Sequence, residues 1–171
     1  KYYIAKSKLL KHKLFEWDRY SDIYPNLKST TNWLEAKDIV LNSFNNFSEK
    51  FAVEAKKFFD NNWSDAKREV GKRSGAYCAY VSNSLHPYVF MDFTGEQRDV
   101  ETLAHELGHG LHAVFAKNNN YLDFRPSTAT AEIASTFAEL LVYHDLYKKA
   151  KTKKEKINLL GGQLQGSFAT I

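Results

Sequence analysis

The sequence has little cysteine, proline or methionine, and it has no long hydrophobic run. A single cysteine, Cys78, excludes an internal disulfide framework and is typical of a protein from a reducing compartment. No segment approaches the run of about 18 apolar residues that a membrane-spanning helix needs, and the N-terminus lacks the charged-then-apolar order of a secretory signal. We therefore expect a cytoplasmic protein without a membrane partner.

Repeats and low-complexity tracts are also absent, whereas aromatic residues are abundant. Phenylalanine, tyrosine and tryptophan make up 15% of the chain, which is typical of a packed globular protein. The net charge is +4, and lysines are dense between Lys148 and Lys156. That region follows a predicted helix, where cations favour the C-terminal dipole, and it lacks a recognisable arginine-rich module. We expect a solvated helix end there and no nucleic-acid partner.

The most informative stretch is His105-Glu106-Leu107-Gly108-His109. On a helix, residues four positions apart project from one face with Cβ atoms about 5 to 6 Å apart, so both histidines can reach one Zn²⁺ at about 2.0 to 2.1 Å. Glu106 is rotated by about 100° from His105, so it can flank the ion and accept a proton from an attacking water. This pattern indicates peptide-bond hydrolysis. The competing interpretation is two ordinary histidines on a solvated or buried helix face.

The surrounding residues favour a helix over positions 96–117. Thr94 and Gln97 fit a capping box that would satisfy the free amides of the first turn. Apolar residues then recur at three- and four-residue steps, at Val100, Leu103, Ala104, Leu107, Leu111, Val114 and Phe115. Gly108 and Gly110 are unusual inside a helix, where each costs up to about 1 kcal/mol relative to alanine. They indicate that a neighbouring backbone approaches the helix here.

A catalytic zinc needs a third protein ligand, for which the best candidate is Glu132. It lies on a second predicted helix, Thr128–Lys149. The expected buried side of that helix comprises Ile133, Phe137, Leu140, Leu141 and His144. Another side carries carboxylates and hydroxyls without a lysine, at Glu132, Thr136, Glu139 and Tyr143. Such a stripe is usually solvated, but it also suits a metal ligand followed by an acceptor for a histidine N–H group, a role that we expect for Glu139.

His112 is the alternative third ligand because it lies three residues beyond His109. Three ligands from one continuous helix would not converge easily on a single ion. We therefore expect His112 to pack against its neighbours or to lie on the substrate side.

Between residues 71 and 95 the pattern changes from helical to extended. Two short segments, 76–81 and 88–93, are rich in aromatic or β-branched residues and are joined by a predicted turn, which predicts a β-hairpin. An extended peptide can add to an exposed strand edge through main-chain hydrogen bonds. We expect such contacts from Gly75, Ala76 and Tyr77. A hairpin that only packs on the helix is the alternative.

Four consecutive blocks of sequence carry a resemblance to a known family. They are Gly71–Tyr77, Pro87–Phe93, Leu103–His109 and Ala131–Thr136. Together they resemble oligoendopeptidase F, within the thimet-oligopeptidase-like zinc peptidases. The resemblance implies that His105, His109 and Glu132 bind zinc and that Glu106 is the general base.

The same resemblance implies a downstream segment whose histidine and tyrosine side chains bind substrate and stabilise the oxyanion, and nothing in this chain matches it. Residues 160–171 resemble the beginning of the helix that precedes that segment. We therefore expect an internal fragment of a catalytic domain that binds metal but cleaves poorly or not at all. Loss of one oxyanion donor alone costs about 10²- to 10³-fold in turnover.

The sequence as a whole predicts a mainly α fold with a small β-hairpin or sheet, as in an incomplete zincin-like metallopeptidase core. Residues 31–61 predict one long amphipathic helix. We divide the fragment 1–171 into a helical lead-in (1–70), the hairpin (71–95), the zinc-binding helix pair (96–150) and the start of a further helix (151–171). The predicted function is a zinc metalloendopeptidase that hydrolyses oligopeptides, with one Zn²⁺ per chain, and no oligomeric state is indicated. The alternative is a catalytically inactive, zinc-stabilised helical domain for protein interaction.

Overall fold

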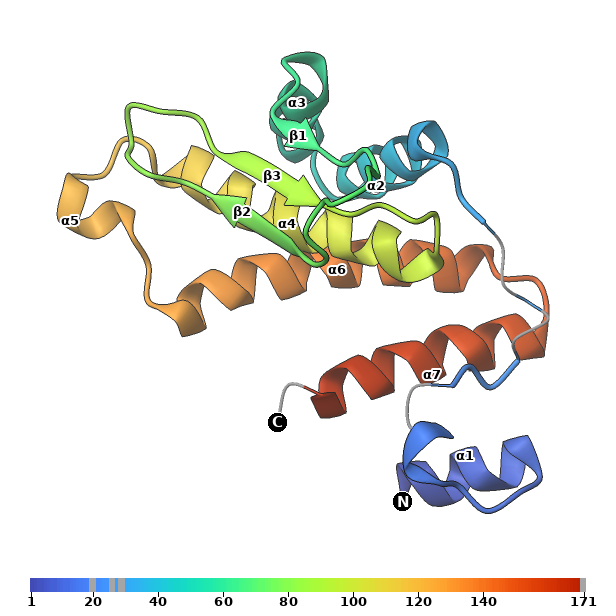
Figure 1. Cartoon of the computed structure of the whole chain (residues 1–171). Helices are drawn as coiled ribbons and strands as arrows, with labels where there is room; N and C mark the ends of the chain where they lie inside the picture. Colours follow the sequence, from blue (N-terminus) through green and yellow to red (C-terminus); the bar gives the residue numbers. More distant parts are fainter. Residues whose placement is uncertain (19–20, 25–26, 28–29, 170–171) are drawn as a thin grey trace. The chain divides into compact units, whose positions relative to one another are not determined.

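The computed structural model describes residues 1–18, 21–24, 27 and 30–169, and the chain divides into two compact units. Residues 29–142 form the larger unit, and residues 1–28 with 143–171 form the smaller one. The predicted fold class is confirmed, because helices dominate and the strands form one small sheet (Figure 1). None of the described helices is long and apolar enough to cross a membrane.

The larger unit has a layered arrangement. Its elements are α2 (Trp33–Phe47), α3 (Glu49–Asp60), β1 (Ser64–Asp65), β2 (Ala76–Ala79), β3 (Tyr88–Met91), α4 (Gln97–Ala116), α5 (Tyr121–Phe124) and most of α6 (Thr128–Lys149). The strand order is β1-β3-β2, with β1 parallel and β2 antiparallel to β3. Figure 1 shows the β2–β3 hairpin against one side of α4 and α6 against another. Helix α4 therefore lies at the centre of this unit.

The core of the larger unit forms around the apolar stripe of α4. Its buried members are Val100, Leu103, Ala104, Leu107 and Leu111, as predicted. Phe115, at the end of the stripe, is exposed instead. Val89 and Met91 of β3 and Phe58 of α3 are also buried. Each fully buried side chain of this size contributes roughly 1.5 to 3 kcal/mol, so this core holds α4 and the sheet in place.

The predicted single helix over residues 31–61 is wrong, because the chain breaks at Ser48. This residue is extended, with φ −161° and ψ 124°, and α3 begins directly after it. Its N–H donates to the carbonyl oxygen of Phe44 at 2.8 Å and closes α2. The break allows the rings of Phe44 and Phe51 to meet edge to face, with centroids 4.9 Å apart. An apolar stripe shows which residues are buried, but it does not show whether the helix that carries them is continuous.

The predicted capping box of Thr94 and Gln97 is also wrong. The acceptor at the start of α4 is Asp99, whose Oδ2 accepts the N–H of Glu96 at 3.1 Å. The same oxygen accepts the N–H and the hydroxyl of Thr94 at 2.8 and 2.7 Å. Gln97 donates instead to Glu101 at 3.1 Å. A carboxylate in the first turn satisfies these free donors and also interacts favourably with the helix dipole.

Helix α6 has the predicted bounds, but its buried side is not the predicted one. Ile133, Phe137, Leu140 and His144 are exposed, and Leu141 is only partly buried. The buried residues are Ala131, Ser135, Ala138, Glu139 and Val142. Small side chains face α4 because the two backbones come close together there, and a Cβ atom on Gly108 would lie 2.7 Å from the Cα of Ser135. The close approach predicted from Gly108 is therefore confirmed, and it explains why large residues are excluded from this side.

The smaller unit joins segments from both ends of the chain. It contains α1 (Tyr2–Leu10), a short 3₁₀ helix η1 (Glu16–Asp18), the end of α6 and α7 (Lys153–Ala169). The hydroxyl of Tyr2 donates to the carbonyl oxygen of Gly161 at 3.1 Å, and Nζ of Lys6 donates to Oε1 of Gln165 at 3.1 Å. Lys6 is buried, and burial lowers the pKa of its ammonium group. These two bonds link α1 to α7.

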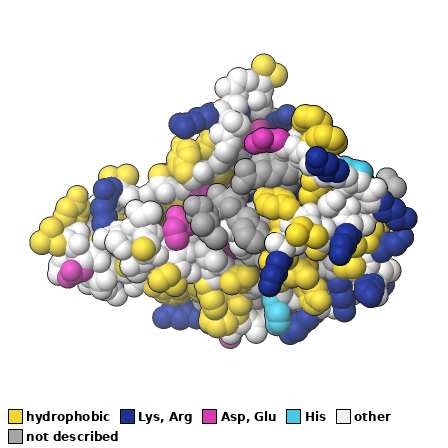
Figure 2. Space-filling model, turned by 90° about the horizontal axis from the view of Figure 1, so that it is seen from below, with side chains coloured by type: hydrophobic (Ala, Val, Ile, Leu, Met, Phe, Trp, Pro, Cys, Tyr) yellow, Lys and Arg dark blue, Asp and Glu magenta, His cyan; other side chains and the backbone are white. Residues whose placement is uncertain are grey.

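Large apolar side chains are exposed in the larger unit as well as buried. Those more than 60% exposed include Leu34, Val81, Leu85, Leu122 and Ile133. On the face drawn in Figure 2, hydrophobic side chains reach the surface among lysine and arginine side chains. Apolar atoms contribute more than half of a typical protein surface, so single exposed residues of this kind indicate no function by themselves.

Candidate metal centre

Three predicted ligands meet between α4 and α6. Nε2 of His105 lies 3.3 Å from Oε2 of Glu132, and Nε2 of His109 lies 3.7 Å from the same oxygen. Ligands at about 2.0 to 2.1 Å around a tetrahedral Zn²⁺ are roughly 3.3 Å apart, so this spacing fits one ion. Within the described ranges, no other three histidine, cysteine or carboxylate side chains form such a group.

The donor set and its exposure also fit a catalytic zinc. Two imidazole nitrogens and a carboxylate oxygen are donors that zinc accepts, and three protein ligands leave a fourth position open. The side chain of Glu132 is 49% exposed, so the group is open to solvent on that side. The hydroxyl of Ser135 donates to Oε2 of Glu132 at 2.9 Å and restrains the carboxylate.

The second ring nitrogen of His105 contacts Glu139. Nδ1 lies 3.2 Å from Oε2 of Glu139, so a proton on Nδ1 leaves the Nε2 lone pair directed toward Glu132. Burial lowers the pKa of His105, but the hydrogen bond to Glu139 and the nearby carboxylates outweigh burial, and the net pKa is raised. For Glu139 the sign is opposite: burial raises its pKa, but His105 and Arg98 outweigh burial and hold the pKa below its ordinary value.

The surroundings of His109 favour its neutral imidazole form, because its pKa is lowered. Burial lowers its pKa, the charges of His105 and His112 lower it further, and Glu132 opposes these effects only in part. A neutral imidazole is the form that binds metal. His112 itself is partly buried on α4 and stands outside the group of three ligand atoms.

Glu106 lies beside the three candidate ligands but is not one of them. It is buried, and the backbone N–H of Cys78 on β2 is near enough to its carboxylate to lower its pKa. Burial raises the pKa of Glu106 to about 7; the charge of Glu132 also raises it, whereas His105 and the Cys78 N–H oppose the rise. A carboxyl group with a pKa near neutrality can both accept and release a proton at working pH.

The predicted peptide-binding residues lie at the beginning of β2, which is an edge strand. Gly75 has φ +98° and accepts the N–H of Asp92 at 3.3 Å. Hydrogen-bonded and non-hydrogen-bonded pairs alternate in an antiparallel ladder, so Ala76 and Cys78 direct their backbone groups to the open edge. Tyr77, between them, is half-exposed. The open edge of β2 therefore lies near Glu106, whose pKa is lowered by the backbone N–H of Cys78.

Two side chains that the sequence reasoning missed touch the site. Nη1 of Arg98 lies 3.0 Å from Oε1 of Glu139, and Ser135 donates to Glu132 as described above. Helical spacing could have indicated Ser135, because it follows Glu132 by about one turn. It could not have indicated Arg98, which reaches the site only through Glu139 of α6.

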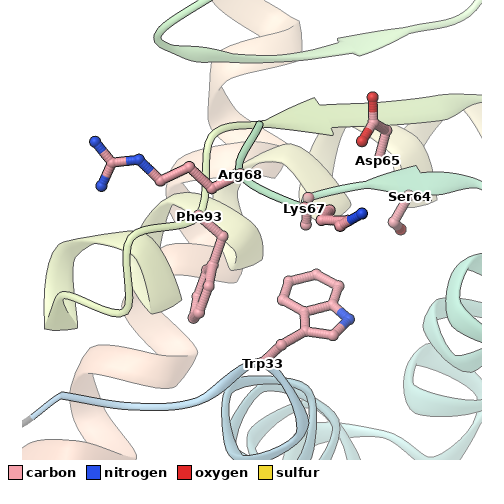
Figure 3. Close-up of a pocket in the computed structure, with 7 residues that line it drawn as sticks. Trp33, Ser64, Asp65, Lys67, Arg68 and Phe93 are labelled. Atoms are coloured by element: carbon pink, nitrogen blue, oxygen red, sulfur yellow. The ribbon is translucent and has the colours of Figure 1, made fainter. Parts of the chain in front are cut away.

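A separate pocket of about 390 Å³ lies at the other edge of the sheet, beside β1. Its lining residues are Trp33, Ser64, Asp65, Ala66, Lys67, Arg68 and Phe93. Figure 3 shows the rings of Trp33 and Phe93 on one side of this space and the side chains of β1 on another. The three candidate ligands do not line this pocket, so it is distinct from the candidate metal centre.

Comparison with known proteins gives consistent relationships. The sequence profile of peptidase family M3 matches residues 5–171. The chain is 30% identical over 158 residues to oligopeptidase PepF of Bacillus subtilis, covering 91% of this chain and 23% of that protein. It is 32% identical over 170 residues to the chromosomal oligoendopeptidase F of Lactococcus lactis subsp. cremoris, covering 95% of this chain and 28% of that protein. The resemblance indicated by the four sequence blocks is thus confirmed.

The fold is also similar to that of a solved structure. A crystal structure from Chlamydophila abortus superimposes with a TM-score of 0.83 at 30% identity, covering 99% of this chain and 29% of that one. The chain therefore spans about a quarter of the length of the curated relatives that it matches.

Proposed function

This chain belongs to peptidase family M3, and from that premise we propose that it carries the metal-binding part of a zinc endopeptidase that hydrolyses oligopeptides. The observation that supports this most strongly is the meeting of His105, His109 and Glu132, with Glu106 beside them. The names of the relatives, oligopeptidase PepF and oligoendopeptidase F, support the substrate class.

In this proposal one zinc ion is held by Nε2 of His105, Nε2 of His109 and a carboxylate oxygen of Glu132. When bound, zinc supplies Lewis acidity that polarises a scissile carbonyl group and acidifies water. Glu139 fixes the His105 ring through Nδ1, and Ser135 restrains the Glu132 carboxylate. These contacts limit the reorganisation that the side chains need before they bind the ion.

Glu106 acts as the general base. Its carboxylate takes a proton from the attacking water and later delivers that proton to the leaving amine. The positive charge of a metal ion nearby favours the carboxylate form, so Glu106 starts in the state that accepts a proton. The Cys78 N–H on β2 favours the charged form of this carboxylate, which is the form that accepts a proton.

The substrate is proposed to bind in an extended conformation along the open edge of β2. Of the three predicted residues, Ala76 is the candidate for this main-chain contact, because it directs its N–H and C=O outward. Gly75 and Tyr77, on either side of it, direct their backbone groups toward β3. The half-exposed ring of Tyr77 stacks on Phe90 at 5.0 Å between centroids, so it is fixed in position. His112 is proposed to lie on the substrate side of α4.

The proposed catalytic residues also suggest how residues 1–171 divide into functional parts. We propose the hairpin (71–95) and the helix pair (96–150) as the catalytic core, with residues 1–70 as lead-in and 151–171 as the start of a further helix.

Replacing Glu106 by Gln in the intact protein that carries this chain tests the proposal. The substitution keeps the size and polarity of the side chain but removes the base, so hydrolysis of a fluorogenic oligopeptide should fall by at least about 10²-fold. Zinc content measured by elemental analysis should remain near one ion per chain, because Glu106 is not a ligand. Asp65→Asn, a carboxylate-to-amide change on β1, provides the matched control and should leave turnover unchanged.

Full activity in the Glu106→Gln protein would refute the general-base assignment. The competing function, an inactive zinc-stabilised interaction domain, predicts bound zinc together with no hydrolysis by the unsubstituted protein.

A further inference from the structure

Arg98 occupies a position that connects three acidic or metal-binding side chains. Its Nη1 lies 3.0 Å from Oε1 of Glu139 and 3.2 Å from Oε2 of Glu101. The other oxygen of Glu139 lies 3.2 Å from Nδ1 of His105. A continuous series of contacts therefore runs from Arg98 through Glu139 to the ring of His105.

The two buried carboxylates in this series of contacts need a positive charge nearby. Glu101 and Glu139 are both buried, and two buried carboxylates near each other are costly unless a positive charge compensates them. The guanidinium of Arg98 contacts both, whereas its side chain remains 56% exposed. Arg98 therefore supplies charge to the buried carboxylates without being part of the apolar core.

The geometry also restricts the Glu139 carboxylate. One oxygen is held by α4 through Arg98 and the other is at the ring of His105, which lies two turns further along the same helix. A carboxylate fixed at both oxygens cannot rotate freely, so it presents a constant acceptor to Nδ1 of His105. The direction of the Nε2 lone pair is then fixed as well.

We propose that Arg98 is a positioning residue for the metal centre: by holding Glu139, it orients the His105 ring and strengthens zinc binding. This inference rests on the proposed function, because it assumes that His105 is a ligand. It extends that function by assigning a role to Arg98, which is neither a proposed zinc ligand nor a hydrogen-bond partner of one.

The test compares Arg98→Met, Arg98→Lys and Arg68→Met in the intact protein, with zinc affinity measured by competition with a chromophoric chelator. Arg98→Met should weaken zinc binding by about 10- to 100-fold, the range typical for partners of metal-binding histidines. Arg98→Lys keeps the charge and should recover part of the loss. Arg68→Met makes the same chemical change at an exposed arginine beside the separate pocket and should leave the affinity unchanged.

A double-substitution cycle shows whether Arg98 acts through Glu139. If it does, Arg98→Met should have little further effect on zinc affinity in a Glu139→Gln background, because the two changes remove one shared interaction. The absorption spectrum of the Co²⁺-substituted protein should change in the same way for both single variants. Additive losses of affinity, or a Co²⁺ spectrum altered by only one of them, would overturn the inference.

A purely structural role is separated by thermal unfolding. If Arg98→Met lowers the unfolding temperature while zinc affinity stays within about twofold, Arg98 is not a positioning residue. His109→Ala, measured in parallel, tests the underlying proposal. Unchanged zinc affinity in that variant would overturn the metal centre itself, whereas a strong loss there with no effect of Arg98→Met would overturn only the role of Arg98.

Discussion

Replacing Gly108 by Ala should destabilise the protein and weaken metal binding, because Gly108 is where α4 and α6 come closest. A Cβ atom at this position would lie 2.7 Å from Cα of Ser135, 2.8 Å from the carbonyl oxygen of Ala134 and 2.8 Å from Cβ of Ala138. Two of these atoms belong to the α6 backbone, so a side-chain rotation cannot relieve the clash. To reach ordinary contact at 3.4 Å, the helices must separate by roughly 0.6 to 0.7 Å.

The free energy of unfolding follows from two opposing effects. Alanine in a helix interior is favoured over glycine by about 0.5 to 1 kcal/mol. Overpacking of a tight contact costs about 1 to 3 kcal/mol, and a contact with backbone atoms belongs to the upper part of that range. The net effect should be a loss of about 1 to 2 kcal/mol. Gly162→Ala in α7 is the matched control, because no atom lies within 4 Å of its added Cβ, and it should stabilise by about 0.5 to 1 kcal/mol.

Zinc affinity should respond to the same displacement. Ser135 lies one turn after Glu132, so separating the helices moves the Glu132 carboxylate away from His105 and His109. Urea unfolding followed by circular dichroism gives the stability, and competition with a chelator gives the zinc affinity. If Gly108→Ala were as stabilising as Gly162→Ala and bound zinc with unchanged affinity, the close helix contact and its link to the ligand geometry would both be refuted.

Three further predictions concern other groups. Burial, with a smaller effect from Glu106, raises the pKa of the Cys78 thiol to about 12. A thiol reagent at about pH 8 should therefore modify Cys78 far more slowly in the native protein than in the urea-unfolded protein, and equal rates would contradict the burial of Cys78. Burial also raises the pKa of Glu101 above its ordinary value. The folded state therefore favours the protonated form of Glu101, and the contribution of this side chain to stability is present at low pH and is lost as pH rises toward the raised pKa. Glu101→Gln cannot ionise, so it should gain stability relative to the parent as pH rises above about 4, the ordinary pKa of a glutamate, whereas a pH-independent difference would argue against the shift. Removing metal with a chelator should lower the unfolding temperature, since zinc at a thousandfold excess over its Kd adds about 4 kcal/mol; an unchanged temperature would count against a bound ion.

Features that depend on local spacing could be predicted from the sequence. The bounds of α6 are those expected, and the close approach at Gly108 follows from a small residue inside an amphipathic helix. His105 and His109 share a face because they are four residues apart on one helix. In each case a single element contains all the information.

Features that depend on contacts between elements were harder to predict. Helical periodicity predicts a buried side of α6 that comprises Ile133, Phe137, Leu140, Leu141 and His144. Close packing on α4 favours the smaller Ala131, Ser135 and Ala138 there instead. The break at Ser48 depends on the packing of α2 against α3, which helical periodicity does not show.

The candidate site shows the same distinction. Glu132 was named from its residue type and from the stripe of polar residues around it, and the structure brings it to the two histidines. Arg98 was missed because its importance depends on Glu139, which comes from another helix. A sequence pattern on α4 alone gives no reason to select this arginine among the other charged residues.

The most direct test of the central claim is a crystal structure of metal-replete protein with anomalous diffraction collected at the zinc edge. One anomalous peak is expected at about 2.0 to 2.2 Å from Nε2 of His105, Nε2 of His109 and a carboxylate oxygen of Glu132. A peak elsewhere, or one with the Glu132 carboxylate beyond bonding distance, would contradict the account.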